Sequence, residues 1–456
     1  MKVIKFGGSS LKNSRDFLKV AKIIINEEEK PVVVLSGICG VTDTLEKYLS
    51  YNKFDEKDLQ CLIQHLKRLH YRIASEAISD IAIRKKVQNT LQNKLEKLER
   101  VLRGVYYIEE LTDRTRDLIL SFGERLSVCI LAGILIDQDV KAKTFEADNI
   151  GVLTNGDFGN AIAILNPTSK NLKENILLSL DKNIIPVITG FFGCDNNGNT
   201  TLLGRNGSDY SASVIAFAVD ADQVDIWKDV DGFMSADPKV IKDAYLLKNL
   251  SYNEAAELSY FGAKILHPRT VEPLVKNNVK IVIKNTYNPN TKGTIIGKHN
   301  SKTTSIKSVA YSKEIGCIKI HGAGVGYKPG VLSNIAQYFS LNKINIKSVI
   351  TSQTCITLLL EKKDLNRGYN FLKSKQIEIV EKIEKITDIA LIAIVGEGLS
   401  CHNGIAAKIF TAVANKKINI ELISAGASEV AYYFIVKEKF LEPALKAIHD
   451  QLNKNN

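Results

Sequence analysis

Cysteine, methionine, tryptophan and proline are scarce in this chain of 456 residues, which holds 7, 2, 1 and 9 of them. The cysteines are scattered and include no Cys-x-x-Cys pair, which disfavours both a zinc site and a disulfide framework. We expect reduced, mostly buried thiols. The seven histidines are equally dispersed, so no metal site built from protein side chains is predicted.

Long apolar runs are also missing from the sequence. No segment approaches the ~20 apolar residues of a membrane-spanning helix, and the N-terminus lacks a charged region followed by an apolar one. These absences predict a cytoplasmic protein with no membrane partner.

Negative charge is in deficit, with 50 Asp and Glu against 61 Lys and Arg, a net charge of +11. A basic surface attracts polyanions, but the lysines are spread along the chain and no arginine-rich run with interleaved aromatic residues occurs. We therefore expect no nucleic acid partner, and infer a milder attraction for small anions such as nucleotides. The composition is that of a globular protein with two to four domains.

Strand-like and helical patterns alternate through the first 300 residues. This alternation is typical of βαβ units and predicts an α/β domain at 1–300, with an open, mainly parallel sheet between helices. From about 55 to 105 the pattern changes to long helices with apolar residues at helical spacing. We interpret that segment as an antiparallel helical insertion with a structural role.

A short apolar strand near the N-terminus runs into Gly7-Gly8-Ser9-Ser10 and then into a helical pattern. Glycines after a strand let the backbone approach a phosphate closely, and Lys5 supplies a point charge. The segment is not a Walker A motif, because no Gly-Lys-Ser/Thr follows the glycines. Strand-Gly-Gly-helix junctions often serve packing only, so this signal is weak by itself.

A second glycine-rich segment, residues 190–212, places hydroxyls, Arg205 and Asp209 directly ahead of an apolar helix. A helix start favours an anion, Arg205 can bind a carboxylate through two hydrogen bonds, and Asp209 can hold a cation. The pattern predicts a site for a charged amino acid beside a phosphate. The alternative is that Arg205 and Asp209 pair with each other as a structural salt bridge.

An internal repeat follows a polar linker near residue 300. Gly322, Gly324 and Gly330 recur as Gly396, Gly398 and Gly404, each set between a strand-like and a helical pattern. The repeat predicts two equivalent α+β modules, at 312–385 and 386–456, with the C-terminal end of the second as a candidate to complete the first. The glycine spacing does not match a dinucleotide fingerprint.

Five motifs, taken in order, resemble those of the aspartokinases. They are Lys5-Phe-Gly-Gly-Ser-Ser, Phe122-Gly-Glu-Arg-Leu-Ser, Gly204-Arg-Asn-Gly-Ser-Asp-Tyr-Ser, Trp227-Lys-Asp-Val-Asp-Gly with Ala236-Asp-Pro, and Phe261-Gly-Ala-Lys-Ile-Leu-His-Pro. The resemblance spans nearly the whole chain and implies the amino acid kinase fold followed by two ferredoxin-like ACT domains.

The resemblance implies transfer of the γ-phosphoryl group of ATP, with Mg²⁺, to the side-chain carboxylate of L-aspartate, the first step toward lysine, threonine and methionine. The chain ends soon after the second module, so we expect a monofunctional kinase without a fused homoserine dehydrogenase. The two ACT modules imply a homodimer or higher homo-oligomer and inhibition by an amino acid, lysine first and threonine second. That the modules only dimerise the protein is the alternative.

Carried over by position, the resemblance assigns catalysis to Lys5, Asp209 and Lys264. It assigns the aspartate pocket to Ser36, Thr42, Glu124, Arg205, Ser208 and Asp209. Glu124 would face the substrate ammonium and Arg205 the α-carboxylate. The implied ATP contacts are Lys5, Gly7, Gly8, Ser9, Lys228, Asp229, Met234, Lys239 and Lys264. The implied effector contacts are Ser348, Thr351, Ser352 and Gln353.

Four positions depart from the family pattern. Asn206 replaces a glycine, which fits if the backbone there is left-handed, a conformation that asparagine tolerates. Met234 stands where tyrosine is usual and Lys239 where arginine is usual, which weakens adenine stacking and phosphate binding. Gln353 replaces a glutamate, and a neutral amide cannot pair with an effector ammonium as a carboxylate can.

Other interpretations stay open at this point. A catalytically silent amino acid sensor would keep the repeat but lose Lys5 or Asp209. A kinase of the same fold for another carboxylate or a nucleotide monophosphate would lack Glu124 and the repeat. At single positions, Glu124 is alternatively an ordinary ion-paired carboxylate and Thr42 a helix N-cap. His267 and Trp227 are expected to be structural.

Overall fold

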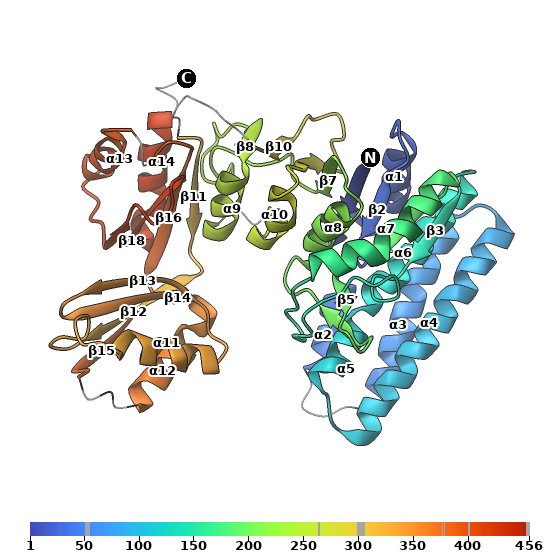
Figure 1. The fold of residues 1–456 in the computed structure, drawn as a ribbon, viewed down its shortest axis with the longest axis horizontal. Coiled ribbons are helices and arrows are strands. Elements are labelled where there is room, and N and C mark those ends of the chain that lie inside the picture. Colours follow the sequence, from blue (N-terminus) through green and yellow to red (C-terminus); the bar gives the residue numbers. More distant parts are fainter. Residues whose placement is uncertain are drawn as a thin grey trace. The chain divides into compact units, whose positions relative to one another are not determined.

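The computed structural model describes residues 1–50, 55–262, 265–298, 306–375, 377, 379–399 and 402–452. These residues form two compact units (Figure 1). The first holds residues 1–233, 246–259 and 265–298, and the second holds 234–245, 260–262 and the described residues from 306 onward. Lys264 lies outside the described residues.

The first unit is built on an eight-stranded sheet with the order β3-β4-β2-β1-β7-β9-β10-β8. Neighbouring strands are parallel except β9 and β10, so the predicted mainly parallel sheet is confirmed. The strands are β1 (Lys2–Phe6), β2 (Val32–Leu35), β3 (Ala142–Phe145), β4 (Ile185–Thr189), β7 (Gln223–Lys228), β8 (Asn249–Ser251), β9 (Lys280–Asn285) and β10 (Thr294–Gly297).

Helices cover both faces of this sheet. On one face lie α1 (Ser14–Ile25) and α6 (Phe122–Asp137), and on the other lie α7 (Leu165–Asp181), α8 (Gly207–Ala218) and α10 (Pro268–Val275). The remaining elements are α2 (Val41–Leu49), α5 (Asp113–Leu120), α9 (Tyr252–Phe261) and the hairpin of β5 (Phe192–Cys194) and β6 (Thr200–Leu202). Both α6 and α8 are buried along nearly their whole lengths. Apolar residues therefore predominate around each helix, and most of the polar residues of each gather toward its N-terminal half.

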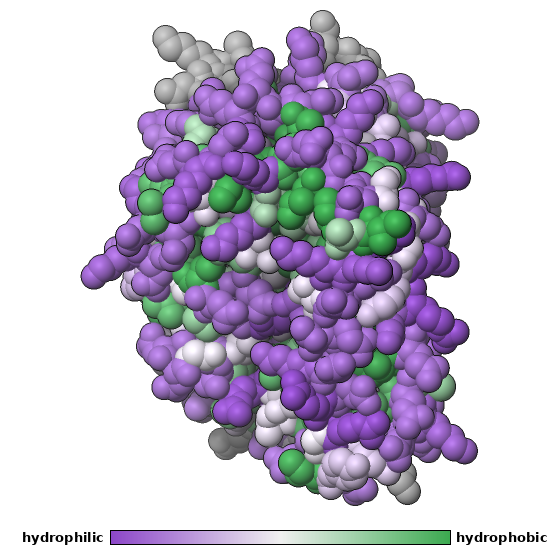
Figure 2. Space-filling view, turned by 90° about the vertical axis from the view of Figure 1, so that its right-hand side faces the viewer, coloured by the Kyte–Doolittle hydropathy of each residue, from purple (hydrophilic) through white to green (hydrophobic). Residues whose placement is uncertain are grey.

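One segment is longer and more apolar than the sequence analysis allowed. The run Asp113–Asp137, which joins α5 and α6, meets the length and composition of a membrane-spanning helix, but 94% of its most apolar window is buried inside the protein. The expectation that no such run exists was therefore wrong, and the run is part of the hydrophobic core of the protein. Figure 2 shows that one face of the molecule is mostly hydrophilic, with hydrophobic residues in separate small patches.

Two long helices, α3 (Glu56–Ala77) and α4 (Ile81–Ile108), form the insertion and lie side by side (Figure 1). Each begins at an aspartate cap, since Asp55 and Asp80 accept hydrogen bonds from backbone N–H groups of the first turn. A leucine stripe that includes Leu66, Leu91 and Leu98 is buried along the pair. The leucines give each helix an apolar face, and the short connection from Ala77 to Ile81 makes the packed pair antiparallel.

The second unit contains two four-stranded antiparallel sheets, each with two helices. The first module has the order β13-β14-β12-β15. Its elements are β12 (Ile315–His321), α11 (Val331–Leu341), β13 (Ile346–Ser352), β14 (Cys355–Glu361), α12 (Lys362–Ser374) and β15 (Lys382–Ile386). This order and connectivity are those of a ferredoxin-like βαββαβ module.

The second module has the order β11-β16-β18-β17. Its elements are β16 (Ile389–Val395), α13 (Ile405–Ala414), β17 (Leu422–Ser424), β18 (Ala431–Lys437) and α14 (Leu441–Leu452), joined by β11 (Ser308–Ser312) from before the first module. We expected the C-terminal end of the second module to complete the first module. Instead, a strand from before the first module completes the second. β15 already fills the fourth place of the first sheet, and β11 pairs with β16 along its whole length, Ser308 opposite Val395.

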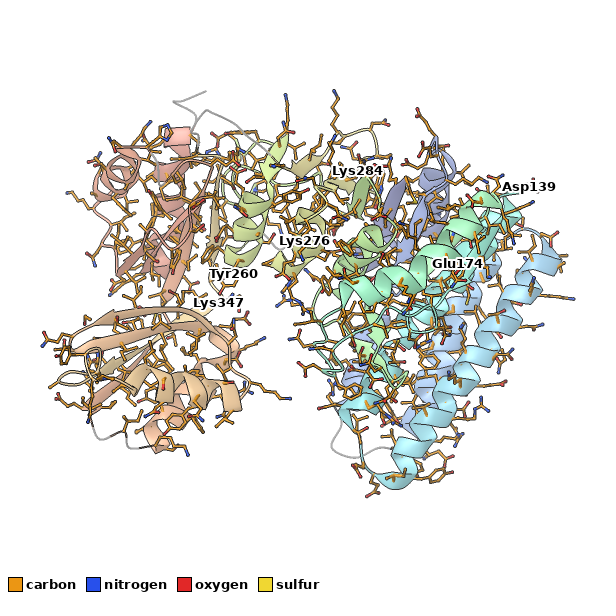
Figure 3. The ribbon with its side chains drawn as sticks, in the orientation of Figure 1. Asp139, Glu174, Tyr260, Lys276, Lys284 and Lys347 are labelled. Atoms are coloured by element: carbon orange, nitrogen blue, oxygen red, sulfur yellow. The ribbon has the colours of Figure 1, made fainter. Side chains whose placement is uncertain are left out.

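The segment 234–245 belongs to the second module although it lies far from it in sequence. Ala236 and Ile241 are buried in that module's hydrophobic core. The hydroxyl of Ser235 bonds to Nε2 of His449 on α14 at 3.0 Å. Elsewhere in this unit, Tyr260 and Lys347 meet (Figure 3), the phenol donating to the Lys347 carbonyl at 3.1 Å.

Candidate active site

A cavity of about 360 Å³ opens at the carboxyl ends of β1, β2 and β7 and the N-terminus of α8. This is where ligands bind in open parallel sheets, because loops and helix N-termini converge there. Polar and charged side chains make up much of its lining. The lining residues are Lys5, Gly7, Gly8, Ser9, Ser36, Thr42, Glu124, Phe191, Asn206, Gly207, Ser208, Asp209, Lys228, Asp229, Val230 and Ile265.

One carboxylate in the cavity is shared by two lysines. Oδ1 of Asp209 lies 2.5 Å from Nζ of Lys5, and Oδ2 lies 2.8 Å from Nζ of Lys228. Burial alone would raise the pKa of Asp209, but Lys228 and Lys5 lower it to about 2. Burial lowers the pKa of Lys5, and the attraction of Asp209 opposes that effect. The trio therefore places two amino groups, one buried and one half-buried, on a single ionised carboxylate.

The pKa of Glu124, on α6, is shifted in the opposite direction from that of Asp209. Its Oε1 accepts the Gly37 N–H at 2.9 Å, and its Oε2 is buried with no hydrogen-bond partner in the part of the chain that the structure describes. Burial raises the pKa of Glu124 to about 8. Glu124 lines the cavity, and a buried carboxyl oxygen without a partner is suited to a cationic ligand.

The N-terminal turn of α6 is fastened to the loop after β2. The Ser127 hydroxyl donates to the Ser36 carbonyl at 2.7 Å, next to the bond from Gly37 to Glu124. A Cβ at Gly37 would lie 3.1 Å from the carbonyl carbon of Gly123, so the two backbones meet because both residues are glycine. This contact fixes where Glu124 enters the cavity.

Three hydroxyls complete the wall. The Ser36 and Ser208 hydroxyl oxygens are 3.1 Å apart and share a hydrogen bond. Thr42 lines the cavity as predicted, but the hypothesis that it caps a helix is wrong. The N-cap of α2 is Gly40, with φ +81°, and Thr42 lies inside the first turn.

The loop Gly7 to Ser10 leaves the end of β1 and forms a short 3₁₀ turn, Gly8–Ser10. A Cβ at Gly7 would lie 3.3 Å from Nζ of Lys5, and one at Gly8 would lie 3.2 Å from the Gly37 carbonyl oxygen. The Ser9 hydroxyl donates to Asp229 at 3.2 Å. The glycines therefore keep the backbone close to the lysine, as the phosphate hypothesis requires.

The turn before α8 settles two questions that the sequence left open. Asn206 has φ +57° and ψ +25°, the left-handed conformation under which it was expected to replace glycine. Arg205 is exposed and precedes the lining residues, while both oxygens of Asp209 are bonded to lysines. The alternative of an Arg205–Asp209 structural bridge is therefore wrong.

Several predicted residues are not brought to this cavity. Met234 and Lys239 belong to the second unit, where the Met234 carbonyl accepts the Ser308 hydroxyl at 2.8 Å and Lys239 is exposed. Lys264 is outside the described residues. The interpretation of His267 and Trp227 as structural is confirmed: Nδ1 of His267 caps α10, and buried Trp227 stacks on Phe6.

The predicted effector residues lie on the edge strand β13 of the second unit and in the turn that follows it. Ser348 on β13 shares a 2.7 Å hydrogen bond with the Tyr433 hydroxyl of β18, which joins the two modules. Thr351, Ser352 and Gln353 are exposed at the end of β13 and in the turn after it. Their side chains are thus accessible to a ligand.

Sequence reasoning missed several lining residues. Phe191 has φ +74°, a strained value for a bulky residue, and its N–H donates to the Ser211 hydroxyl at 2.9 Å. The signal available for it was its place directly after Gly190, at the end of β4. Val230 and Ile265 carry no local signal, because only the fold brings them to the cavity.

Known proteins match this chain over nearly its whole length. Residues 1–285 match the amino acid kinase family, and residues 392–452 match an ACT domain. Chloroplastic aspartokinase 1 of Arabidopsis thaliana is 34% identical over 461 residues, which cover 98% of this chain and 79% of that protein. Lysine-sensitive aspartokinase 3 of Escherichia coli is 27% identical, with 99% and 98% covered. The crystal structure of E. coli aspartokinase III with aspartate and ADP matches with a TM-score of 0.82 at 25% identity, over 99% of this chain and 100% of that one.

Proposed function

Since the chain belongs to the aspartokinases of the amino acid kinase family and is therefore an aspartate kinase, we propose that the cavity beside Lys5 and Asp209 is the site of its reaction. A β-carboxylate oxygen of L-aspartate bonds to the γ-phosphorus of ATP while the bond from that phosphorus to the bridging oxygen breaks. The bridging oxygen leaves with ADP, and 4-phospho-L-aspartate forms. No proton is removed, because the attacking carboxylate is ionised at neutral pH.

The Lys5–Asp209–Lys228 trio, in which Lys5 and Asp209 are buried, is the observation that carries this proposal. Phosphoryl transfer needs positive charge fixed near the phosphate oxygens more than it needs covalent chemistry. Asp209 holds both ammonium groups in place and supplies the opposite charge that offsets the cost of placing them at the cavity. The backbone N–H groups of Gly8 and Ser9 and the Ser9 hydroxyl are assigned to the phosphates. The Gly7 N–H donates to the Trp227 carbonyl at 3.2 Å, so Gly7 is assigned there only for the close approach that its missing side chain allows.

Glu124 is assigned to the substrate ammonium. Its unpartnered Oε2 would gain a charged hydrogen bond when aspartate enters, which returns the carboxylate to its ionised form. Exposed Arg205 is assigned to the α-carboxylate, since its side chain is free of Asp209. Ser36, Thr42 and Ser208 supply hydrogen bonds that orient the substrate.

We assign Mg²⁺ to the phosphates of the incoming ATP. Among the described residues no three His, Cys, Asp or Glu side chains converge, and Asp209 is occupied by two lysines. Mg²⁺ commonly keeps its waters and binds through substrate phosphates and one or two carboxylates, and Asp229 beside Ser9 fits such a role. The ion would add positive charge at the transferring group. Met234, Lys239 and Lys264 are assigned to the nucleotide only by family position.

We assign regulation to the two C-terminal modules, with lysine as the first effector and threonine as the second. E. coli aspartokinase 3, a relative over nearly the full length, is lysine-sensitive. The first module has the same sheet arrangement as the second, which contains the matched ACT domain, although the fourth strand of the second comes from β11. β13 and β17 lie at sheet edges and can pair with a second copy, so a homodimer is expected. A kinase domain at 1–300, apart from the segments 234–245 and 260–262 that belong to the second unit, and a cytoplasmic location complete the proposal.

The test is ATP- and L-aspartate-dependent acyl phosphate formation, trapped with hydroxylamine, with glutamate as the substrate control. Lys5→Met should abolish product, whereas Lys2→Met should not. Lys2 is the matched control, because it lies on the same strand and pairs with Glu27 at 2.5 Å outside the cavity. Lysine and threonine are then added separately. No product from the folded protein with Mg²⁺ would favour the silent sensor.

A further inference from the structure

The segment after β9 supports the glycine loop from outside the cavity. Oγ1 of Thr286 lies 2.7 Å from Oγ of Ser10, and both residues are buried. The Tyr287 hydroxyl donates to the Ser9 carbonyl at 2.8 Å. Two consecutive residues of one segment thus bond to two consecutive residues of the other.

The supporting segment is itself anchored. The Thr286 N–H donates to the Lys228 carbonyl at 2.8 Å, which ties it to the end of β7. The Tyr287 hydroxyl also lies 3.4 Å from Oδ2 of Asp16, a buried residue on α1. The ammonium groups of Lys12 and Lys19 lie 5.4 and 5.0 Å from the centre of the Tyr287 ring. Thr286 is therefore held by β7, and the Tyr287 phenol is held by α1 and by Lys12 just before it.

We propose that Thr286 and Tyr287 are positioning residues for the nucleotide phosphates. Neither lines the cavity, so they act through Ser10 and Ser9 by holding the loop in the conformation that receives phosphate. This inference rests on the proposed function, which assigns that loop to ATP.

The physical reason is the freedom of the loop. Two adjacent glycines give Gly7-Gly8 many accessible backbone conformations, and only some of them present the loop amides together. Apparent ligand affinity falls by the fraction of molecules that hold the competent conformation. Loss of one supporting hydrogen bond is expected to weaken phosphate binding by about fivefold. The loss should appear in ADP affinity and KM for ATP, and less in kcat or KM for aspartate.

The experiment compares Tyr287→Phe with Tyr71→Phe. Tyr71 on α3 is a close match, because its hydroxyl donates to the Gln88 carbonyl at 3.0 Å, has a second acceptor at 3.2 Å, and has Lys67 over its ring. Thr286→Val removes the other hydroxyl, and Thr286→Ser restores it. ADP affinity is measured by calorimetry, and both KM values and kcat by the hydroxamate assay.

We expect about fivefold weaker ADP binding and a similar rise in KM for ATP in Tyr287→Phe and Thr286→Val, with Tyr71→Phe and Thr286→Ser near the original protein. The proposal is overturned if Tyr287→Phe binds ADP as tightly as Tyr71→Phe does, or if KM for aspartate rises equally. An original protein that binds ADP but forms no acyl phosphate would refute the proposed function alone, because the ADP comparison still decides this inference.

Discussion

Glu124 should make aspartate use depend on pH. Burial raises the pKa of Glu124 to about 8, so at pH 7 the free enzyme holds this group mostly protonated, by about tenfold. The substrate ammonium needs the ionised carboxylate. We therefore expect kcat/KM for aspartate to rise with pH, by about tenfold per unit below pH 8, and to level off above it.

The same burial makes Glu124 a stability liability at high pH. Because its folded-state pKa lies above the unfolded value of about 4.5, its contribution to stability is present below pH 4.5 and is lost as the pH rises through 8. At ~1.4 kcal/mol per pKa unit the loss is on the order of 5 kcal/mol by pH 9. Glu124→Gln keeps the shape of the side chain and never ionises. The free energy of unfolding of this variant should therefore exceed that of the original protein increasingly from pH 5 to 9.

The two effects together give a sharp assay. Hydroxamate kinetics from pH 6 to 9 should show a Glu124→Gln variant with little pH dependence and, above pH 8, a loss in kcat/KM of about 100-fold or more, because a buried ammonium lacks its partner. Urea unfolding of the free protein supplies the stability arm. Glu254→Gln, another buried carboxylate outside the cavity, is the control for the pH profile. A flat profile in the original protein, or a variant less stable at pH 9, would refute the reasoning.

Three further substitutions, two of them paired with a control substitution, test the geometry. Asp209→Asn should cost about 3–5 kcal/mol in urea unfolding, because the buried amino group of Lys5 and the half-buried one of Lys228 lose their partner, and unchanged stability would contradict the ion-pair argument. Gly7→Ala should raise KM for ATP, since its Cβ would lie 3.3 Å from Nζ of Lys5, whereas Gly104→Ala in open space on α4 should stabilise by about 0.5–1 kcal/mol. Asn206→Ala should lower the unfolding free energy by about 1 kcal/mol because of its φ of +57°, and Asn206→Gly should not.

The sequence predicted the core of the site because its parts are local. Lys5 with its glycines and Asp209 with its helix each lie next to the end of a strand or the start of a helix, and parallel strands bring such ends together. The family resemblance, now confirmed over 98% of the chain, added Glu124. Thr286 and Tyr287 could not be found in this way, because their partners lie more than 270 residues away and no motif marks them.

The architecture beyond the parallel sheet was less accessible. The repeat predicts two modules but does not say which strand closes which sheet. β11 lies before the first strand of the first module but closes the second sheet, and β15 lies just before the first strand of the second module but closes the first sheet. The register of Ser308 opposite Val395 decides it. Likewise the apolar run Asp113–Asp137 is core only because other elements cover it.

The charge states of the two cavity carboxylates show why residue type alone does not define a site. Asp209 and Glu124 are both buried, and burial by itself raises the pKa of either. Two lysines bring the pKa of Asp209 down to about 2, whereas Glu124, with one backbone N–H donor, stays near 8. One carboxylate is therefore a permanent anchor for cations already present, and the other is held ready for a cation that arrives with the substrate. That division of roles arises from which strands and helices meet at the cavity.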